Sequence, residues 1–270
     1  MPDQPTAIDR IRALEALGTR RLAGTPTEKA VQASLGAEFE ALGYRLDWRP
    51  FRFSRSLYAS LMLHFGVAVF ATGIGLSWPL LGAALHALVA LSYTLESMRR
   101  GLLLRRLFPA ISSQNLLAVK PAKTTMRRRL VLIAHADAAF TGLVFTPGLI
   151  RMATQPPPPG LGWLKKQLGL ATATVAALAI LEAIAAVGLW SAPTWLRYAL
   201  TIPAALTFLL NLDVVLRNRV VPGAADNLSG CSACVVLAHR LEGRLPDDVE
   251  ARHRHQRCGG GWHRRRAASG

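Results

Sequence analysis

The sequence predicts an α/β protein whose soluble segments are interrupted by two transmembrane helical hairpins. Two observations support this fold class. Residues 57–95 contain no Asp, Glu, Lys or Arg, and residues 168–212 form a second long apolar stretch. Around these stretches, segments with helical spacing of apolar residues alternate with short strand-like runs. Because one span needs about 20 apolar residues, each apolar stretch is long enough for a pair of spans.

Each apolar stretch contains a turning point. The first turns back at residues 77–79 (Ser-Trp-Pro) and the second around residues 191–193 (Ser-Ala-Pro). Glu182 and Arg197 interrupt the second stretch, which is the less regular of the two. Buried core helices are the alternative interpretation. We favour membrane spans because of the length of the stretches and because of tryptophans of the interfacial type at Trp78, Trp190 and Trp195.

The basic residues indicate which side of the membrane the soluble segments occupy. The formal net charge is +16, and Arg and Lys gather next to the apolar stretches, whereas the tight turns carry almost no charge. By the positive-inside rule we predict a multi-pass protein of the inner or plasma membrane with a cytoplasmic soluble lobe and the lipid bilayer as partner. The first 50 residues lack the apolar segment of a cleavable signal peptide, so we expect the N-terminal lobe to precede the membrane.

The same charge distribution argues against nucleic-acid binding. A groove for nucleic acid combines a soluble basic face with interleaved aromatic residues. The sequence shows neither pattern, so we predict no nucleic-acid partner.

Local patterns predict the helices and strands of the soluble segments. Thr25 or Thr27 can cap the second helix, which Pro26 opens. We expect the last two strands to be neighbours in one sheet, and the run QPPPPG before Trp163 to be a stiff linker. The predicted helices cover residues 7–17, 26–42 and 229–241, and the predicted strands cover residues 44–53, 114–119 and 130–134.

These patterns divide the chain into six segments. Because each hairpin returns the chain to the side that it left, the soluble segments can join one domain. Residues 1–56, 96–167 and 213–250 form the soluble lobe, residues 57–95 and 168–212 form the transmembrane hairpins, and residues 251–270 form a basic tail.

Polar residues follow the strand LVLIA at the position where open α/β folds place their sites. His135 comes directly after this strand, and Asp137 is two residues further on. A neutral imidazole is a common zinc ligand, and a nearby carboxylate can orient it through its other ring nitrogen. A structural histidine that is hydrogen-bonded to an acid is an equally good interpretation of this motif alone.

A second motif makes the metal interpretation more specific. Asp226 lies in a loop of small residues, PGAADN, just before the predicted helix at 229–241. The alternative role for an Asp-Asn pair there is a helix N-cap. Taken together, the two motifs predict His135 and Asp226 as metal ligands, with Asp137 orienting His135.

Four segments resemble the di-zinc aminopeptidase family, which includes aminopeptidase Y, bacterial leucyl aminopeptidases and glutamate carboxypeptidases. In order along the chain they are RLAGTPTEKAVQASLGAEFEALGY, SQNLLAVKP, LVLIAHADA and VPGAADNLSGCSACVVLAHRL, and they cover about half of it. The resemblance implies an incomplete zinc-peptidase-like mixed sheet with flanking helices, and the hairpins resemble those of the membrane-embedded branches. It also implies hydrolysis of N-terminal peptide bonds of a peptide substrate with two Zn²⁺ ions, one bound by His135 and both bridged by Asp226.

The chain departs from this family after Glu250. The family then needs a Glu-Glu pair, which supplies the general base and a ligand, and further on an Asp and a His, but residues 251–270 contain no acidic residue. Residues 251–270 are also basic, rich in Gly and without apolar periodicity, so we expect no strand there. Because the general base and the later ligands are missing, we expect the chain to be inactive or nearly so. Residues 258–263 (Cys-Gly-Gly-Gly-Trp-His) permit codons that read Ala-Glu-Glu-Val-Gly one base later, so we hypothesise a frameshifted, truncated C-terminus.

The alternative to a metallopeptidase is a non-catalytic membrane scaffold or binding protein with a peptidase-like lobe. A transporter is a weaker alternative, for which Glu182 inside a span would be the functional acid; a structural role for Glu182 is as good an interpretation. The pair Cys231 and Cys234 has C-x-x-C spacing, but a cytoplasmic location predicts free thiols that serve helix packing. A zinc site in the tail has poor spacing and would use His253, His255, Cys258 and His263.

Overall fold

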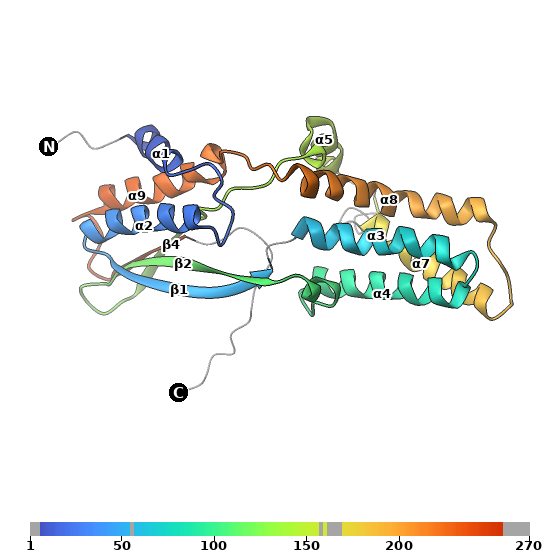
Figure 1. Cartoon of the computed structure of the whole chain (residues 1–270). Coiled ribbons are helices and arrows are strands. Elements are labelled where there is room, and N and C mark those ends of the chain that lie inside the picture. The colour runs from blue at the N-terminus through green and yellow to red at the C-terminus, as the bar shows by residue number, and fades with distance from the viewer. Residues whose placement is uncertain (1–5, 55–56, 157–158, 161–168, 256–270) are drawn as a thin grey trace. The chain divides into compact units, whose positions relative to one another are not determined.

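The computed structural model describes residues 6–54, 57–156, 159–160 and 169–255, and the chain divides into two compact units. Figure 1 labels the elements of both. Trp163, Cys258 and His263 lie outside the described residues. Of the described residues, the sheet unit comprises 6–54, 110–140 and 220–255, and the helical unit comprises 57–109, 141–156, 159–160 and 169–219.

The sheet unit is an α/β layer structure, as the sequence predicts. Within the described residues, four strands form one mixed sheet in the order β1-β2-β4-β3, in which β4 runs antiparallel to β2 and parallel to β3. Helices α1, α2 and α9 lie on one face of this sheet (Figure 1). The elements are α1 (Ala7–Ala16), α2 (Pro26–Ala41), β1 (Arg45–Ser54), β2 (Ala110–Lys120), β3 (Arg128–Ala134), α9 (Ser229–Leu241) and β4 (Val249–His255).

Local sequence signals explain where α2 begins and ends. The Thr25 hydroxyl accepts a hydrogen bond from the Glu28 amide at 3.3 Å, and the Glu28 carboxylate in turn accepts one from the Gly24 amide at 2.6 Å. Pro26 occupies the first turn, where no amide hydrogen is needed. Gly43 has a φ of 74° just after the helix, a conformation that suits glycine. The predicted start and end of this helix are therefore confirmed to within one residue.

The core of the sheet unit lies between the sheet and these helices. Leu35 and Phe39 of α2 and Val235 of α9 are fully buried there, against Leu116 and Ala118 of β2. Burying a side chain of this size contributes about 1.5–3 kcal/mol. The opposite face of β3 carries Val131 and Ile133, which are 46% and 61% exposed.

Strand β4 corrects two expectations from the sequence. No strand was expected beyond Glu250, and β2 and β3 were expected to be neighbours; instead β4 lies between them. Ala251 pairs with Lys120 of β2 and Leu130 of β3, and the ladder continues to His255. Backbone hydrogen bonds on both sides hold such a strand whatever its side chains are, so a sequence without apolar alternation can still occupy this position.

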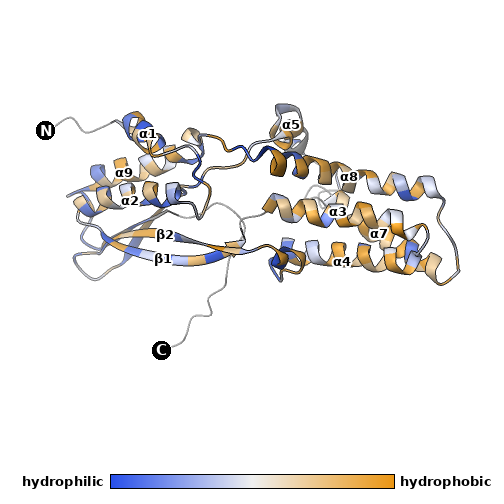
Figure 2. Cartoon of the chain, viewed as in Figure 1, coloured by the Kyte–Doolittle hydropathy of each residue, from blue (hydrophilic) through white to orange (hydrophobic). Residues whose placement is uncertain are grey.

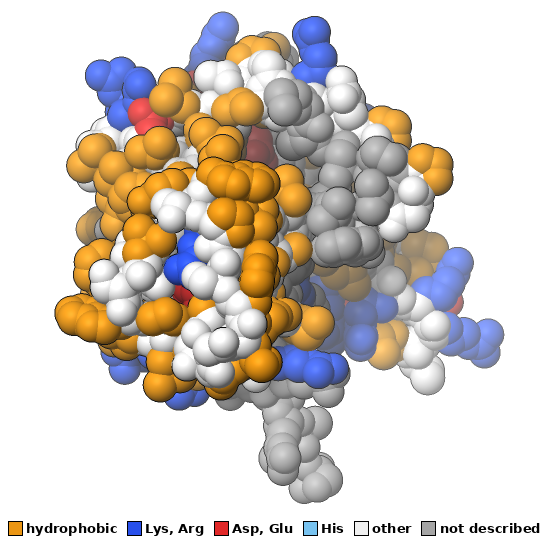
Figure 3. Space-filling model, turned by 90° about the vertical axis from the view of Figure 1, so that its right-hand side faces the viewer, with side chains coloured by type: hydrophobic (Ala, Val, Ile, Leu, Met, Phe, Trp, Pro, Cys, Tyr) orange, Lys and Arg blue, Asp and Glu red, His pale blue; other side chains and the backbone are white. Residues whose placement is uncertain are grey.

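The helical unit contains four helices that are long and apolar enough to cross a membrane, as judged by length and composition among the described residues. Their neighbouring pairs are α3–α4, α3–α8, α4–α7 and α7–α8. Figure 2 shows that hydrophobic residues predominate along these helices, and in Figure 3 hydrophobic side chains cover most of one end of the unit. The helices are α3 (Leu57–Gly75), α4 (Pro79–Ser97), α7 (Gly169–Ala186) and α8 (Thr194–Arg217).

The two hairpins have the turning points that the sequence predicts, although α4 and α8 extend beyond residues 95 and 212. Leu80 and Leu189 near the turns are 74% and 79% exposed. In the described part of this unit, three short helices were not predicted: η1 (Leu104–Leu107), η2 (Leu143–Phe145) and α5 (Pro147–Thr154).

Candidate functional site

The structure brings His135 and Asp226 into direct contact. His135 follows the last residue of β3, and Asp226 lies in the tight turn η4 (Ala224–Leu228) that leads into α9. Nε2 of His135 is 3.1 Å from Oδ1 of Asp226, across 91 positions of sequence. Their roles as zinc ligands stay a prediction, but the convergence on which that prediction depends is present.

Asp137 holds the other side of the imidazole. Nδ1 of His135 is 3.1 Å from the Asp137 carbonyl oxygen and 3.4 Å from its carboxylate Oδ1, which is long for a hydrogen bond. The contact with Asp137 raises the pKa of His135, burial opposes that change, and the Asp226 carboxylate adds a smaller increase. The side chains of His135 and Asp137 are 12% and 10% exposed, whereas that of Asp226 is 77% exposed. Nε2 therefore faces the open side of the site.

The loop around Asp226 leaves its carboxylate available because the next residue caps α9. Oδ1 of Asn227 accepts a hydrogen bond from the Gly230 amide at 3.1 Å. A Cβ at Gly230 would come within 2.2 Å of that oxygen, so this close approach requires glycine. The N-cap alternative for the Asp-Asn pair thus applies to Asn227 and not to Asp226. The peptide bond between the two residues is cis.

Arg21 joins the two loops of the site, and no motif in the sequence marks it. Its guanidinium is fully buried and donates hydrogen bonds to the carbonyl oxygens of Pro222, Gly18 and Ala136. Burial lowers the pKa of Arg21. A Cβ on Gly223 would lie 2.9 Å from the same guanidinium. Arg21 therefore fixes the loop after β3 relative to the loop before α9.

The donor set at this site is suited to zinc but incomplete. One imidazole nitrogen and one carboxylate oxygen are typical zinc donors, and a catalytic zinc has three protein ligands. Among the described residues, no group of three or more His, Cys, Asp or Glu side chains is placed to hold a metal ion. The donors among the described residues are therefore too few for a catalytic zinc site.

The cysteines of α9 are buried free thiols, as the sequence predicts. Cys231 donates to the His135 carbonyl oxygen at 3.2 Å. Burial raises the pKa of Cys231 to about 12 and that of Cys234 to about 11, so neither forms the thiolate that binds metal at neutral pH. Both serve the packing of α9 in the core.

His253 of β4, a candidate ligand in the alternative tail site, points into the core. Its ring packs at 4.9 Å from Phe39 and 5.2 Å from Tyr44, measured between ring centroids. Neither ring nitrogen has a hydrogen-bond partner among the described residues. Burial lowers the pKa of His253 to about 4. This histidine is therefore a neutral core residue.

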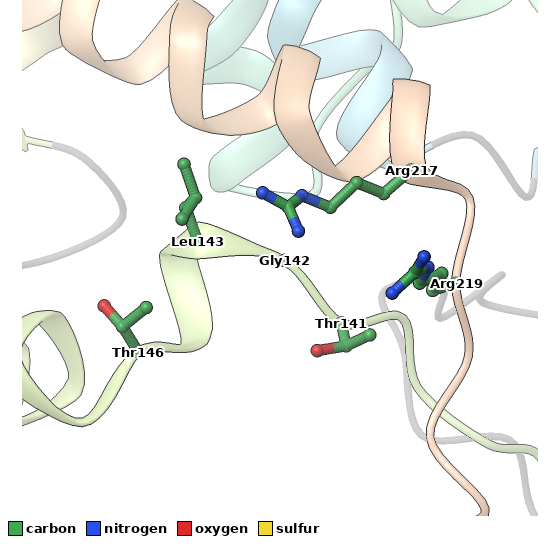
Figure 4. A pocket seen from close by; sticks show the side chains of 6 residues that line it. All are labelled: Thr141, Gly142, Leu143, Thr146, Arg217 and Arg219. Atoms are coloured by element: carbon green, nitrogen blue, oxygen red, sulfur yellow. The ribbon is translucent and has the colours of Figure 1, made fainter.

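A separate cavity of about 220 Å³ lies in the helical unit, and Figure 4 shows its lining. Arg217 comes from the end of α8, where its Nε pairs with Asp213 at 2.5 Å, and Arg219 follows it in the chain. This lining is basic and hydroxyl-bearing, and it contains none of the residues predicted to bind metal. The lining residues are Thr141, Gly142, Leu143, Thr146, Arg217 and Arg219.

Comparisons with known proteins show a distant structural similarity over most of the chain. No family model and no curated protein sequence matches it. The crystal structure of a glutaminyl cyclase from Fimbriiglobus ruber is 14% identical at a TM-score of 0.41, covering 94% of this chain and 47% of that protein. A Zn-dependent exopeptidase from Parabacteroides distasonis is 11% identical at a TM-score of 0.39, covering 92% and 44%. The chain thus spans less than half of either protein, and at this distance the likeness carries no functional argument.

Proposed function

We propose that this chain is a membrane-anchored, zinc-metallopeptidase-like protein. In this proposal the helical unit provides the anchor in the bilayer, and the sheet unit presents His135 and Asp226 as zinc donors. The observation that carries the proposal is the 3.1 Å approach of Nε2 of His135 to Oδ1 of Asp226.

The surroundings of this contact favour a binding site over a structural hydrogen bond. A structural His-Asp pair is expected to be enclosed, because the low dielectric of the interior strengthens it. Here Asp226 is 77% exposed, and His135 is oriented from behind by Asp137. The buried side chain of Arg21 donates three hydrogen bonds that fix the loops beside these residues. Orienting an imidazole through its second nitrogen is the arrangement of many zinc sites.

The proposed activity is aminopeptidase-type hydrolysis of an N-terminal peptide bond, which follows from the resemblance in sequence motifs. A complete site with zinc would supply Lewis acidity toward the scissile carbonyl. The chain as written lacks the Glu-Glu pair that would provide the general base. We therefore propose weak zinc binding and no peptide hydrolysis by this polypeptide.

The two-donor site also fits the second candidate function, a non-catalytic scaffold or binding protein that keeps a peptidase-like lobe. The incomplete donor set among the described residues favours it. The two candidate functions predict different results when the Glu-Glu segment is restored: a broken enzyme should gain peptidase activity, and a scaffold should not.

Zinc titration of the purified full chain tests the site itself. We expect His135→Ala and Asp226→Asn each to weaken zinc binding, and Asp137→Asn to weaken it about 10- to 100-fold through loss of ring orientation. His239→Ala, a partly exposed histidine on α9, is the matched control and should leave affinity unchanged. Zinc affinity that is indifferent to His135→Ala would overturn the proposed site.

An aminopeptidase assay then separates the two functions. Two proteins are assayed with a peptide substrate in the presence of zinc: the chain with the present sequence, and a version whose C-terminal segment is translated in the reading frame that contains Glu-Glu. Activity only in the restored version supports a broken enzyme, whereas a restored version that binds zinc but does not cleave supports the scaffold.

A further inference from the structure

The interior of the helical unit contains an acid and a histidine that are both fully buried. Glu182 of α7 and His86 of α4 have no exposed surface, and Oε2 of Glu182 is 2.8 Å from Nδ1 of His86. Both lie in helices that are long and apolar enough to cross a membrane. An ionisable group in such a position is expensive to bury unless it is neutralised by a partner.

The hydrogen-bond partners of His86 determine where its hydrogen lies. Nε2 is 3.0 Å from the carbonyl oxygen of Ala68, which can only accept. Thr72 is 3.3 Å from the same nitrogen but is not available as its donor. Thr72 has one hydroxyl hydrogen, and its acceptors are the Ala68 carbonyl oxygen at 3.3 Å and the Thr201 hydroxyl at 2.8 Å, because Thr201 itself donates to the Arg197 carbonyl oxygen at 2.8 Å. Nε2 must therefore carry the hydrogen.

This assignment leaves one further proton to place. With Nε2 protonated, the 2.8 Å contact between Nδ1 and Oε2 requires a proton between these two atoms. The second carboxyl oxygen of Glu182, Oε1, is buried and has no hydrogen-bond partner among the described residues. An ionised carboxylate would be left with a single donor in an apolar interior, whereas a carboxylic acid needs only one acceptor. The geometry thus favours a proton on Glu182, donated to Nδ1 of His86.

The helices are shaped to receive this carboxyl group. A Cβ on Gly75 would lie 2.1 Å from Oε1, and a Cβ on Gly82 would lie 2.5 Å from Oε2. Any larger residue at either position would displace the Glu182 carboxyl. Gly75 ends α3 and Gly82 lies in the first turn of α4, so the two glycines form a notch around the acid.

A buried basic residue of the same unit does not form an ion pair with Glu182. Arg197 of α8 is 3% exposed, and it directs Nη1 to the Gly75 carbonyl oxygen and Nη2 to the Ser191 hydroxyl, both at 3.0 Å. It makes no ion pair with Glu182 within 4 Å in the described part of the chain. In the described residues, the groups within hydrogen-bonding distance of the pair are the Thr72 hydroxyl and the Ala68 carbonyl oxygen.

The same unit contains a second polar cluster. If hydrogen bonds connected it to the His86–Glu182 pair, the two clusters could form a path for protons; if not, the pair is a local site. The second cluster consists of His64, which contacts Ser92 at 2.8 Å, and of the ion pair between Glu96 and Arg105 at 2.6 Å. His64 precedes Thr72 by eight residues of α3, a rise of about 12 Å. Between the clusters lie fully buried apolar side chains, including Phe65, Ala68 and Val89. Among the described residues, no hydrogen-bonded chain crosses this layer.

We infer that His86 and Glu182 form a proton-binding site inside the helical unit, with the proton on the Glu182 carboxyl. This site is independent of the metallopeptidase proposal. The bound proton lets an acid and a base join α4 to α7 without placing a net charge on the pair.

Infrared spectroscopy of the full chain tests this inference at neutral pH in a maltoside detergent, which has no carbonyl group of its own. We expect a carbonyl stretching band of a protonated carboxyl group that shifts in D₂O and is lost in Glu182→Gln. Glutamine preserves the shape and can donate its amide hydrogen to Nδ1. Glu96→Gln is the matched control, because Glu96 is paired with Arg105, and it should retain the band.

A second variant covers the case in which Glu182→Gln does not fold. His86→Phe removes the acceptor while keeping a ring, so the band should persist and move to higher frequency. Absence of the band in the unaltered chain, its survival in a folded Glu182→Gln protein, its loss in Glu96→Gln, or an unchanged position in His86→Phe would each overturn the proton site.

Discussion

The buried histidine of β4 should make the sheet unit sensitive to acid. His253 has no exposed surface, and both of its ring nitrogens lack a partner among the described residues. Acidification must either protonate this ring in the core or open the sheet around it. Replacement by isoleucine, His253→Ile, removes the titrating group and places a β-branched residue in a central strand.

The size of the acid effect follows from the two pKa values of the ring. Burial lowers the pKa of His253 to about 4 in the folded state, against about 6.5 in an unfolded chain. Between these values the unfolded state binds a proton that the folded state does not. Above about pH 6.5, protonation of His253 therefore costs the folded state almost nothing. As the pH falls, this one group lowers the free energy of unfolding by about 2 kcal/mol at pH 5 and about 3 kcal/mol at pH 4. At pH 7.5, His253→Ile should be more stable by about 1–2 kcal/mol, because no unpaired polar nitrogen is buried.

Hydrogen exchange followed by mass spectrometry measures this effect locally, which suits a chain with two units. The free energy of opening is read from peptides that cover β2 and β4, after correction for the intrinsic exchange rate at each pH. Subtracting the result for His253→Ile removes contributions from other titrating groups, and His239→Ala serves as a control that should keep the acid effect. Equal loss of protection in the unaltered chain and in His253→Ile would refute the reasoning.

Two further predictions concern the buried groups around the candidate site. Arg21→Met should destabilise the sheet unit by about 3 kcal/mol or more, since three hydrogen bonds from a charged donor are lost and the carbonyl group of the buried residue Ala136 loses its Arg21 donor. Chemical denaturation and zinc titration should show the loss, and Arg20→Met, at the exposed neighbouring position, should not. Cys231 and Cys234, whose pKa values burial raises to about 12 and about 11, should resist alkylation at pH 8 in the folded chain and react after denaturation; rapid labelling of either residue in the folded state, mapped by peptide mass spectrometry, would contradict their assigned burial.

Elements with a local signal could be predicted from the sequence. The cap and proline at Thr25 and Pro26 mark α2, and the length of the uncharged stretch from residue 57 marks the first hairpin. The convergence of His135 and Asp226 could also be anticipated, because each lies at a strand or helix end where such folds gather polar groups.

Features that depend on tertiary contacts could not be predicted. Arg21 sits in a short irregular segment, and its importance comes from three carbonyl groups, two of which are remote in sequence. Glu182 could be recognised from the sequence as an acid inside a predicted span. Its partner His86 is 96 residues away, and no sequence pattern links the two residues. The notch of Gly75 and Gly82 likewise depends on how α3, α4 and α7 pack.

Strand β4 was missed because the sequence Val-Glu-Ala-Arg-His-Arg-His lacks the alternation of a half-buried strand. The composition of β4 also bears on the frameshift hypothesis. If the bases are read one position later, the codons of His253 and His255 specify isoleucine or threonine, whatever synonymous codons are used for them and for the following residues. Both are β-branched residues that suit a central strand. The buried, unpartnered imidazole of His253 is therefore what the frameshift hypothesis predicts for the core.

The position of β4 also sets the order in which the sheet can assemble during translation. Residues 135–248, including the second pair of apolar helices, separate β3 from the strand that joins it to β2. At ribosomal speeds of about 5–20 residues per second, that interval lasts about 6–23 s. Throughout it, β2 and β3 have open hydrogen-bonding edges, which invite pairing with other chains. Of the four described strands, the last to leave the ribosome is thus the one that joins β2 to β3.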